Sequence, residues 1–370
     1  MAPVTWSRLP EDLLESILRK PTNVVNLYKC SFVCHAWRSV VERVLASTPP
    51  HRLVYSKELR IVRSISFKNV FTGATKVCRL PEFNTGDGRP LFPRSVYSWH
   101  RWLVMDCSTF HACNHLNHRG DHHICLYDPF SNARIRFPAF TLDNFVSIDP
   151  TRRKFVVSID PTRRKFVVSC DPKNPRSIGL AVRNGRYLEK LMFWKPGDGE
   201  WTTFVVQQLR IFDITSYEGG FCALDGELKR IEFDHELGTL KIKHVSSSYH
   251  HPTNYLVESL CGDLLLVQLN IEREVKVFKM DWVRKAWDEI ESLGDEAIFL
   301  SCHESVSIQA KDYTIFKPNC IYFTDGAFSM PVEQQELGVY DIANQTVSSV
   351  PLSIPRDDKK QCYRWFTTQI

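Results

Sequence analysis

The chain has 370 residues, of which 43% are hydrophobic and 24% are charged, and its formal net charge at pH 7 is +5. This length allows two or three domains with hydrophobic cores, and the composition argues against extensive disorder. The mild charge gives no strong electrostatic case for nucleic-acid binding, because proteins that bind nucleic acid normally carry a concentrated basic face. The chain has neither an apolar run of about eighteen residues nor the charged-then-apolar start of a signal peptide, so we expect a soluble, intracellular protein. Its twelve cysteines are then expected to be reduced.

The first residues of the chain predict three short helices. The first helix begins at Pro10, since proline suits the first helical position and the acidic Glu11 and Asp12 suit the positive end of the helix dipole. It ends before Pro21, because proline disfavours helical geometry in the residue before it. The apolar positions expected for the three helices are, in order, Leu13, Leu14, Ile17 and Leu18; Val24, Val25 and Leu27; and Phe32, Val33, Ala36, Trp37, Val40, Val41 and Val44. A unit of about forty residues with so many apolar positions normally needs a partner to bury them.

The segment from residue 4 to residue 46 resembles an F-box, the motif that docks substrate receptors onto the SKP1-like subunit of cullin-RING (SCF) ubiquitin ligases. The likeness rests on Leu9-Pro10 at the start, the paired aliphatic residues that follow, and Val33-Cys34 three residues before Trp37. It implies that nine residues line the adaptor-binding face or the small core behind it: Leu9, Pro10, Leu13, Leu14, Ile17, Leu18, Val33, Cys34 and Trp37. The alternative is an ordinary three-helix cap that packs on the following domain.

After a short linker at residues 47–51, residues 52–370 carry short β-type runs separated by turn residues. Two of these units are alike: Tyr127 and Tyr340 are each followed by aspartate, a turn, and a proline eleven residues after the tyrosine. Such repetition favours a β-propeller of about six blades, because radial repetition of small antiparallel sheets protects their edges. The alternative is a β-sandwich, which at about 320 residues would be unusually large.

The same region resembles the DUF295, or KIB-type, β-propeller domain of plant F-box proteins. The resemblance rests on three blocks in order: YLVES followed by GDLLLV at 255–267, LGD followed by AIFL at 293–300, and NCIYFTD at 319–325. Trp365-Phe366 also matches the tail of that family. The resemblance implies a multidomain protein of α plus all-β class, with a three-helix F-box followed by the propeller.

The segment VSIDPTRRKFV occurs twice in succession, at 146–156 and at 157–167. Each copy offers a short strand and an Asp-Pro turn, so the two copies compete for one place in a sheet. The duplication either adds a hairpin that alters a binding surface or is looped out at an edge. We expect deletion of 157–167 to leave the fold intact or to stabilise it. The basic clusters 152–154 and 163–165 are interpreted as exposed turn tips rather than as a nuclear signal or a phosphate contact.

Histidine and cysteine residues are frequent between Cys107 and Cys125. Zinc prefers nitrogen and sulfur ligands of this kind, and the candidate ligands are His115, His118, His122 and Cys125. The pattern lacks the two defined ligand pairs of a zinc module, so a polar loop is the simpler interpretation and no metal or other cofactor is assigned. The sequence also lacks a nucleophile elbow, a P-loop and a dinucleotide-binding motif, so no catalytic residue is predicted.

The F-box and propeller resemblances together imply a non-catalytic substrate-recognition subunit of an SCF-type E3 ubiquitin ligase. The helices would dock on a SKP1-like adaptor, and through it on a cullin, while the propeller presents a target protein that the sequence does not identify. One alternative is a protein that sequesters or scaffolds its target outside the SCF complex. Another is a propeller that binds or hydrolyses a small molecule and whose helices form only a cap. Binding to a membrane or to nucleic acid is not expected.

Overall fold

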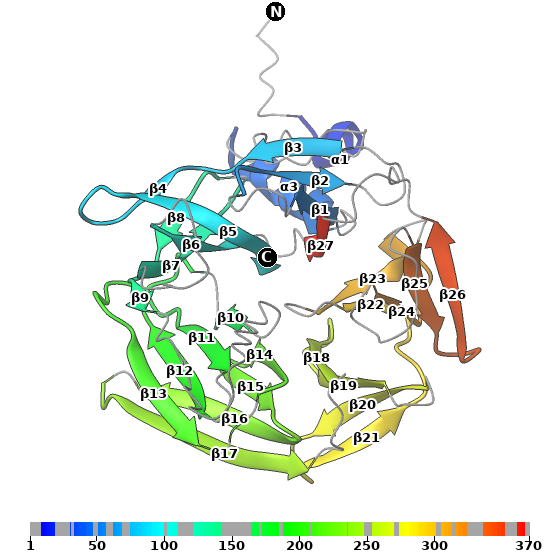
Figure 1. Cartoon of the computed structure of the whole chain (residues 1–370). Coiled ribbons are helices and arrows are strands. Elements are labelled where there is room, and N and C mark those ends of the chain that lie inside the picture. The colour runs from blue at the N-terminus through cyan, green and yellow to red at the C-terminus, as the bar shows by residue number, and fades with distance from the viewer. Residues whose placement is uncertain are drawn as a thin grey trace, which may run out of the picture.

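The structure is a computed structural model of the chain, and Figure 1 shows a ring of β-sheets with helices near the N-terminus. The residues that it describes are 9–18, 30, 33–46, 51–56, 62–68, 75–99, 102–109, 121–129, 131–141, 164–169, 172–184, 188–207, 209, 211–234, 236–247, 254–269, 274–300, 305–312, 316–323, 336–351 and 361–366. The predicted order of a helical unit followed by a β-propeller is confirmed. The β-sandwich alternative is wrong, because the sheets are arranged around a centre instead of in two layers.

Two helices are described in the N-terminal segment, α1 (Glu11–Leu18) and α3 (His35–Ala46). Helix α1 begins directly after Pro10 and carries Glu11 and Asp12 in its first turn, where the helix dipole favours acidic side chains. The helix predicted around Val24, Val25 and Leu27 lies outside the described residues.

Four of the described sheets have four strands each, ordered β27-β1-β2-β3, β10-β11-β12-β13, β14-β15-β16-β17 and β18-β19-β20-β21. All pairs of neighbouring strands within them are antiparallel. Their bounds are β27 (Gln361–Phe366), β1 (His51–Ser56), β2 (Ser64–Lys68) and β3 (Thr75–Arg79); β10 (Arg164–Val168), β11 (Gly179–Asn184), β12 (Leu188–Trp194) and β13 (Thr202–Gln207); β14 (Asp213–Tyr217), β15 (Gly220–Leu224), β16 (Glu227–Asp234) and β17 (Thr239–Ser247); and β18 (Asn254–Glu258), β19 (Leu264–Leu269), β20 (Val275–Asp281) and β21 (Ala286–Ile290).

Two further sheets are larger. A five-stranded sheet has the order β23-β22-β24-β25-β26, in which β22 and β24 run parallel, and a six-stranded sheet has the order β4-β5-β6-β7-β8 with β9 paired to β7. Their bounds are β22 (Glu296–Leu300), β23 (Val306–Gln309), β24 (Cys320–Phe323), β25 (Glu336–Asp341) and β26 (Thr346–Pro351), with the 3₁₀ turn η3 (Ala310–Asp312) after β23; and β4 (Phe83–Asn84), β5 (Pro90–Trp99), β6 (Trp102–Ser108), β7 (Asp121–Tyr127), β8 (Arg134–Arg136) and β9 (Phe140–Thr141). The six sheets of the described residues together make up the ring in Figure 1.

The last strand of the chain closes this ring. Strand β27 pairs antiparallel with β1, from His51 opposite Phe366 to Ser56 opposite Gln361, and Figure 1 shows the two strands side by side. The Trp365-Phe366 tail therefore belongs to the closing strand. This sheet contains strands from the start and from the end of the propeller sequence. Opening the ring at this sheet therefore requires breaking a strand pair between distant parts of the chain.

Aspartate side chains recur at the turns that follow strands β7, β16, β20 and β25. Each accepts a hydrogen bond from a backbone amide two or three residues later, at 2.8–3.3 Å. The four aspartates are Asp128, Asp234, Asp281 and Asp341. This contact is the usual reason for aspartate at a turn, and it explains the similarity of the segments after Tyr127 and Tyr340.

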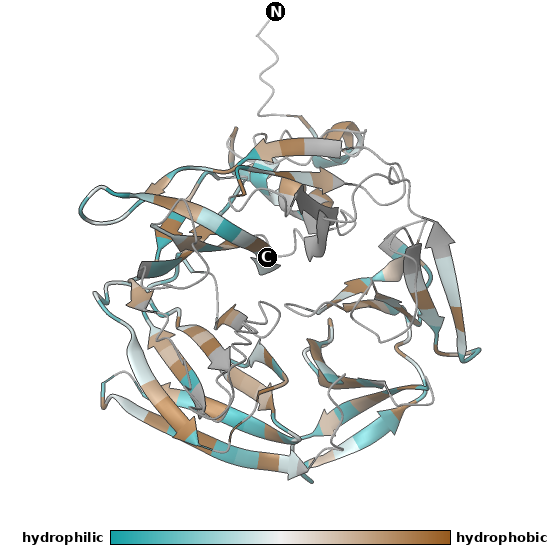
Figure 2. Ribbon diagram, in the orientation of Figure 1, coloured by the Kyte–Doolittle hydropathy of each residue, from teal (hydrophilic) through white to brown (hydrophobic). Residues whose placement is uncertain are grey.

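The hydrophobic cores lie between neighbouring sheets. Phe137, which follows β8, is fully buried, and its ring lies 5.0 Å from that of Phe166 in β10 and 4.3 Å from that of Trp194 in β12. Figure 2 shows hydrophobic and hydrophilic residues mixed along the outer strands, as expected for strands with one face toward a core and one toward water.

The second copy of the tandem repeat supplies strand β10, and the first copy lies outside the described residues. Arg164 and Lys165 pair with Arg183 and Val182 of β11. The interpretation of these two basic residues as turn tips is therefore wrong, because the backbone that carries them is part of the ladder.

Candidate partner-binding surface and a pocket between two sheets

The two described N-terminal helices share a small apolar core. Leu14 and Leu18 of α1 meet Val40, Val41 and Val44 of α3, and each of these five side chains is at most 4% exposed. The same cluster is bordered by partly buried side chains of Leu9, Cys30 and Trp37. This core fixes which side of α1 faces inward.

Ion pairs between the helices support the same packing. Arg43 of α3 donates from Nη2 to Glu11 Oε2 at 2.8 Å, and its Nε lies 3.7 Å from Glu15 Oε2. The hydrogen bond to Glu11 raises the pKa of the Arg43 guanidinium. These pairs lie at the surface, where solvent screening makes their contribution to stability small, so they orient the helices more than they hold them together.

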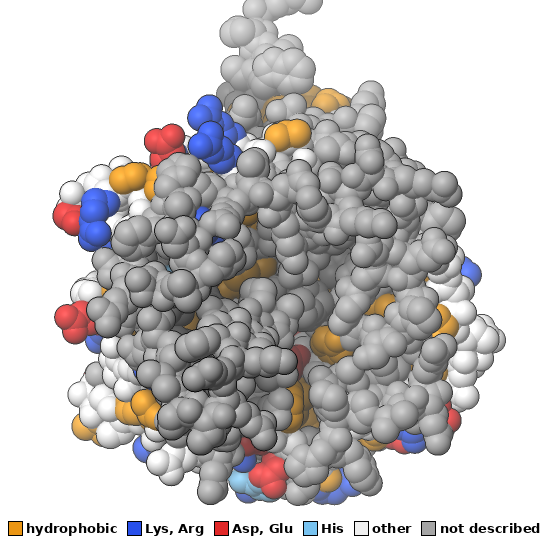
Figure 3. Space-filling model, viewed as in Figure 1, with side chains coloured by type: hydrophobic (Ala, Val, Ile, Leu, Met, Phe, Trp, Pro, Cys, Tyr) orange, Lys and Arg blue, Asp and Glu red, His pale blue; other side chains and the backbone are white. Residues whose placement is uncertain are grey.

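The opposite side of α1 presents aliphatic side chains to solvent. Leu13 is 52% exposed and Ile17 is 42% exposed, and their spacing of four residues places them on one face of the helix. Val33, just before α3, is 52% exposed, and Pro10 is also exposed. We call Pro10, Leu13, Ile17 and Val33 the exposed apolar set. Figure 3 shows hydrophobic side chains at the surface in the region where Figure 1 draws the helices.

The nine residues predicted for partner binding are therefore divided by the fold. Four form the exposed apolar set, while Leu14 and Leu18 are buried in the helix core. Leu9, Cys34 and Trp37 lie between these extremes, with part of each side chain accessible. Only the exposed and half-buried residues are available to a partner without a change in helix packing.

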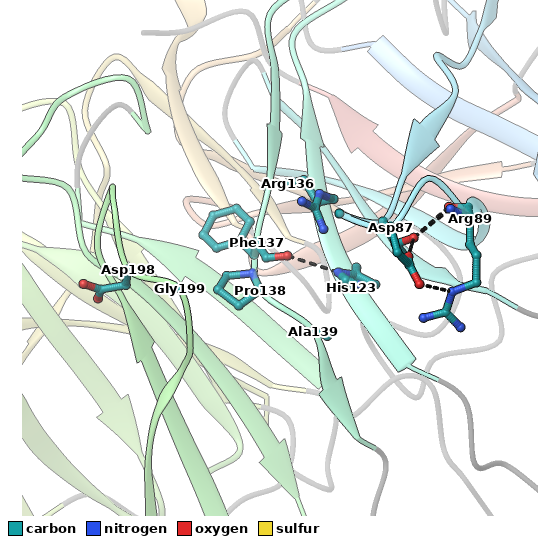
Figure 4. Close-up of a pocket in the computed structure, with 11 residues that line it drawn as sticks. Asp87, Arg89, His123, Arg136, Phe137, Pro138, Ala139, Asp198 and Gly199 are labelled. Carbon is teal, nitrogen blue, oxygen red and sulfur yellow. Dashed lines mark hydrogen bonds and ion pairs between the residues drawn. The ribbon is translucent and has the colours of Figure 1, made fainter.

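A pocket of about 420 Å³ lies between the sheet of β4–β9 and the sheet of β10–β13 (Figure 4). It is lined by Thr85, Gly86, Asp87 and Arg89 from the β4–β5 turn, His123 of β7, Arg136 of β8, Phe137, Pro138 and Ala139 before β9, and Asp198 and Gly199 from the β12–β13 turn. We call this the rim pocket. Its volume is in the range of small-molecule and side-chain binding sites, which is about 300 to 1,000 Å³.

The β4–β5 turn forms one wall of the rim pocket and is held by its own hydrogen bonds. The amide of Thr85 donates to the carbonyl of Arg89 at 2.8 Å, and the amide of Arg89 donates to the Thr85 hydroxyl at 2.9 Å. The Asp87 carboxylate accepts from the Thr85 hydroxyl and, at 2.7 Å, from Arg89 Nε. These contacts, with the Thr85 hydroxyl first, lower the pKa of Asp87.

The segment that precedes β9 forms the floor of the rim pocket. The buried His123 places Nδ1 3.2 Å from the Phe137 carbonyl oxygen, and since a carbonyl only accepts, Nδ1 is the donor. The indole of Trp201 donates to the Pro138 carbonyl at 2.9 Å and its ring stacks on Phe137 with centroids 5.5 Å apart. The floor is therefore anchored to the neighbouring sheet.

Two family descriptions match this sequence. One is the KIB1-4 beta-propeller, over residues 78–341, and the other is the F-box domain, over residues 6–45. The chain belongs to the KIB1-4 β-propeller family. It is also an F-box protein, as the order of Leu9-Pro10, the paired aliphatics and Trp37 predicted.

Proteins of Arabidopsis thaliana are similar to this KIB1-4 propeller protein over most of its length. Putative F-box protein At5g66830 is 20% identical over 395 residues, which cover 98% of this chain and 92% of that protein. Putative F-box protein At3g25750 is 24% identical over 354 residues, which cover 88% of each chain. F-box protein SKIP23 is 20% identical, with coverage of 94% and 91%. The similarity therefore extends over nearly the whole length of these proteins.

Two candidate zinc ligands lie in strand β7 of the KIB1-4 propeller, where they point in different directions. His122 and Cys125 are three residues apart, so their side chains leave opposite faces of the strand. His122 Nδ1 lies 3.4 Å from Asp106 Oδ1, whereas Cys125 is buried. The structure does not bring these two together, and no group of three potential metal ligands occurs in the part of the chain that it describes. His115 and His118 lie outside that part.

The rim pocket was not predicted. Its charged residues Asp87, Arg89, Arg136 and Asp198 come from three separate stretches of the sequence, and no motif connects them. Among the described residues, no helix is long and apolar enough to cross a membrane.

Proposed function

We propose that this chain is the substrate-recognition subunit of an SCF-type E3 ubiquitin ligase. The N-terminal helices dock on a SKP1-like adaptor, which connects the chain to a cullin, and the propeller presents a target protein. The chain contributes no catalytic residue. The ligase acts by holding the target close to a ubiquitin-charged enzyme carried by other subunits, which raises the effective concentration of the reacting groups. Such a subunit works in the cytoplasm or the nucleus.

The exposed apolar set is the observation that carries this proposal. Leu13, Ile17 and Val33 are each roughly half exposed on a unit whose core already contains Leu14 and Leu18. Exposed aliphatic side chains on an F-box domain are suited to binding a protein partner, because association removes their apolar surface from water. Burying the accessible part of each of these three side chains would contribute about 1 kcal/mol to the free energy of binding. Trp37, still partly accessible, adds a large aromatic side chain of the kind that dominates many interfaces.

Co-purification with a SKP1-like protein tests the proposal. The intact chain is compared with the triple variant Leu13→Ala, Ile17→Ala, Val33→Ala, which keeps the buried helix core. We expect the variant to bind about a hundredfold more weakly, since three contributions of about 1 kcal/mol are lost.

A matched control uses aliphatic side chains of similar exposure on the propeller. Val77 of β3 is 64% exposed, Val205 of β13 is 54% exposed and Val347 of β26 is 47% exposed. Replacing these three by alanine should leave adaptor binding unchanged. Failure of the intact, folded chain to bind a SKP1-like protein would reject the ligase role and favour sequestration of the target outside the SCF complex.

A further inference from the structure

We propose that the rim pocket binds an oxyanion carried by a side chain of the target protein, with Arg136 as the main charge that holds it. The oxyanion is the phosphate of a phosphorylated residue or the carboxylate of an acidic residue. This inference rests on the proposed function in one respect: the bound side chain is taken to belong to a target protein.

Arg136 is the cation of the rim pocket that no described carboxylate neutralises. Arg136 is an exposed residue, and its guanidinium has no hydrogen-bond or ion-pair partner among the residues that the structure describes. Asp87 is engaged by the Thr85 hydroxyl and by Arg89, within its own turn. Asp87 is thus already paired within its own turn, and the positive charge of Arg136 favours an anionic ligand.

The second carboxylate of the pocket lies at its other end. Asp198 Oδ2 accepts a hydrogen bond from the Lys195 amide at 3.1 Å, which holds the side chain in the β12–β13 turn. Figure 4 shows Asp198 on the far side of Phe137 and Pro138 from Arg136. The Arg136 end of the pocket therefore favours an anion, and the Asp198 end favours a hydrogen-bond donor.

Gly86 leaves the Arg136 guanidinium uncovered. A Cβ atom built on Gly86 would meet only Arg136 Nη2, at 4.0 Å, so a larger side chain at this position would lie against the guanidinium. The adjoining turn is fixed by the hydrogen bonds of Thr85, and the floor is fixed by those of His123 and Trp201. The backbone segments that line the pocket beside Arg136 are thus already fixed and need little rearrangement when a ligand binds, which favours affinity.

Arg134 provides a matched control on the same strand. It lies two residues before Arg136, on the same face of β8, but its Nη1 donates to the Glu82 carbonyl and its Nη2 to Asn132 Oδ1, each at 3.4 Å. It does not line the rim pocket. Replacing Arg134 or Arg136 by glutamine removes the same charge from the same sheet, but only Arg136→Gln removes it from the pocket.

The experiment measures fluorescence anisotropy of three labelled peptide pools with the purified, intact chain. The pools carry phosphoserine, glutamate or alanine at a fixed central position, flanked by degenerate positions. We expect at least one acidic pool to bind more tightly than the alanine pool, and inorganic phosphate to compete. Arg136→Gln should weaken this binding about tenfold, as expected when one charge-assisted contact is lost, whereas Arg134→Gln should change it by less than about twofold.

The variant Gly86→Leu keeps every charge and covers the guanidinium, so it should weaken the same binding. Preference for the phosphoserine pool would identify phosphorylation as the source of the oxyanion, and equal preference for glutamate would identify an acidic segment. The inference is overturned if the alanine pool binds as tightly as both acidic pools, if Arg134→Gln and Arg136→Gln act alike, or if phosphate binds while no pool does. Adaptor co-purification is measured separately, so failure of the pocket leaves the proposed ligase role testable.

Discussion

The hydroxyl of Tyr217 donates a hydrogen bond of 2.9 Å to the carbonyl oxygen of Gly262, and this contact joins two neighbouring sheets of the propeller. The Tyr217 ring also stacks on Trp282 with centroids 5.4 Å apart, and the indole of Trp282 donates to the same hydroxyl at 3.3 Å. The turns at the ends of these two sheets are thus connected by one side chain. Burial is the main reason that the pKa of Tyr217 is raised.

The variant Tyr217→Phe should lower the free energy of unfolding by about 1 kcal/mol or more, because it removes the hydroxyl that donates to Gly262 and accepts from Trp282, and keeps the ring. Urea unfolding of the purified chain measures the change. Tyr340→Phe is the control, since the Tyr340 hydroxyl donates to the Val275 carbonyl at the longer distance of 3.5 Å. An equal loss in both variants would contradict a specific role for the Tyr217 contact.

Leu13 and Leu14 are neighbours in α1 and should respond to mutation in opposite ways. Leu14→Ala creates a cavity in the helix core and should destabilise the helical unit by about 3 kcal/mol. Leu13→Ala should change its stability by less than about 0.5 kcal/mol and weaken adaptor binding. Hydrogen exchange of the amides of residues 11–18 measures the first effect, and co-purification measures the second. Increased exchange in Leu13→Ala would show that Leu13 has a structural role.

The turn after β20 should make the protein more sensitive to acid. The backbone amide of Arg284, then its guanidinium, lower the pKa of Asp281. A lowered pKa in the folded state stabilises the fold above the unfolded-state pKa of about 3.9, and this stabilisation is lost as the pH falls through the folded-state pKa. We therefore expect Asp281→Asn to have a lower Tm than the natural sequence at pH 7 and a difference that shrinks toward pH 3. Asp295→Asn is the control, because the Asp295 carboxylate lies 3.9 Å from Lys311 and is largely exposed. A difference that grows on acidification would contradict this account.

Removal of the closing strand should abolish cooperative folding of the propeller. A chain that ends at residue 360 lacks β27 and leaves β1 as an unpaired sheet edge. We expect this truncation to aggregate or to unfold over a broad temperature range. A chain that ends at residue 366 keeps β27 and should unfold like the full sequence. Scanning calorimetry separates the two cases, and a sharp transition in the shorter chain would show that the ring closes without β27.

One copy of the tandem repeat should be sufficient for the fold. Deleting 146–156 or 157–167 yields the same sequence, and the remaining copy retains the RKFVV segment that forms β10. The Tm of the deletion variant should therefore equal or exceed that of the natural sequence. A clear decrease would show that the additional eleven residues contribute to stability.

Local patterns in the sequence determined the helical start, the F-box motif and the turn chemistry of the propeller. Pro10 with two acidic residues specifies a helix N-terminus through nearby backbone groups, and the aspartates of the turns act over two or three residues. These signals need no information about distant parts of the chain. Resemblance to known families extended them to the domain order, which the matched families confirm.

Tertiary structure decided which of the four aliphatic side chains of α1 face inward. Leu13, Leu14, Ile17 and Leu18 all recur at helical spacing, and only the position of α3 separates the buried pair from the exposed pair. Likewise, the pairing of β1 with β27 and the approach of Gly86 to Arg136 join residues that are far apart in the chain. Helix starts and turns depend on local hydrogen bonds and dihedral preferences, whereas these contacts depend on how the whole chain packs. The sequence by itself therefore determined the kind of protein, and the folded chain decided which side chains are available for binding.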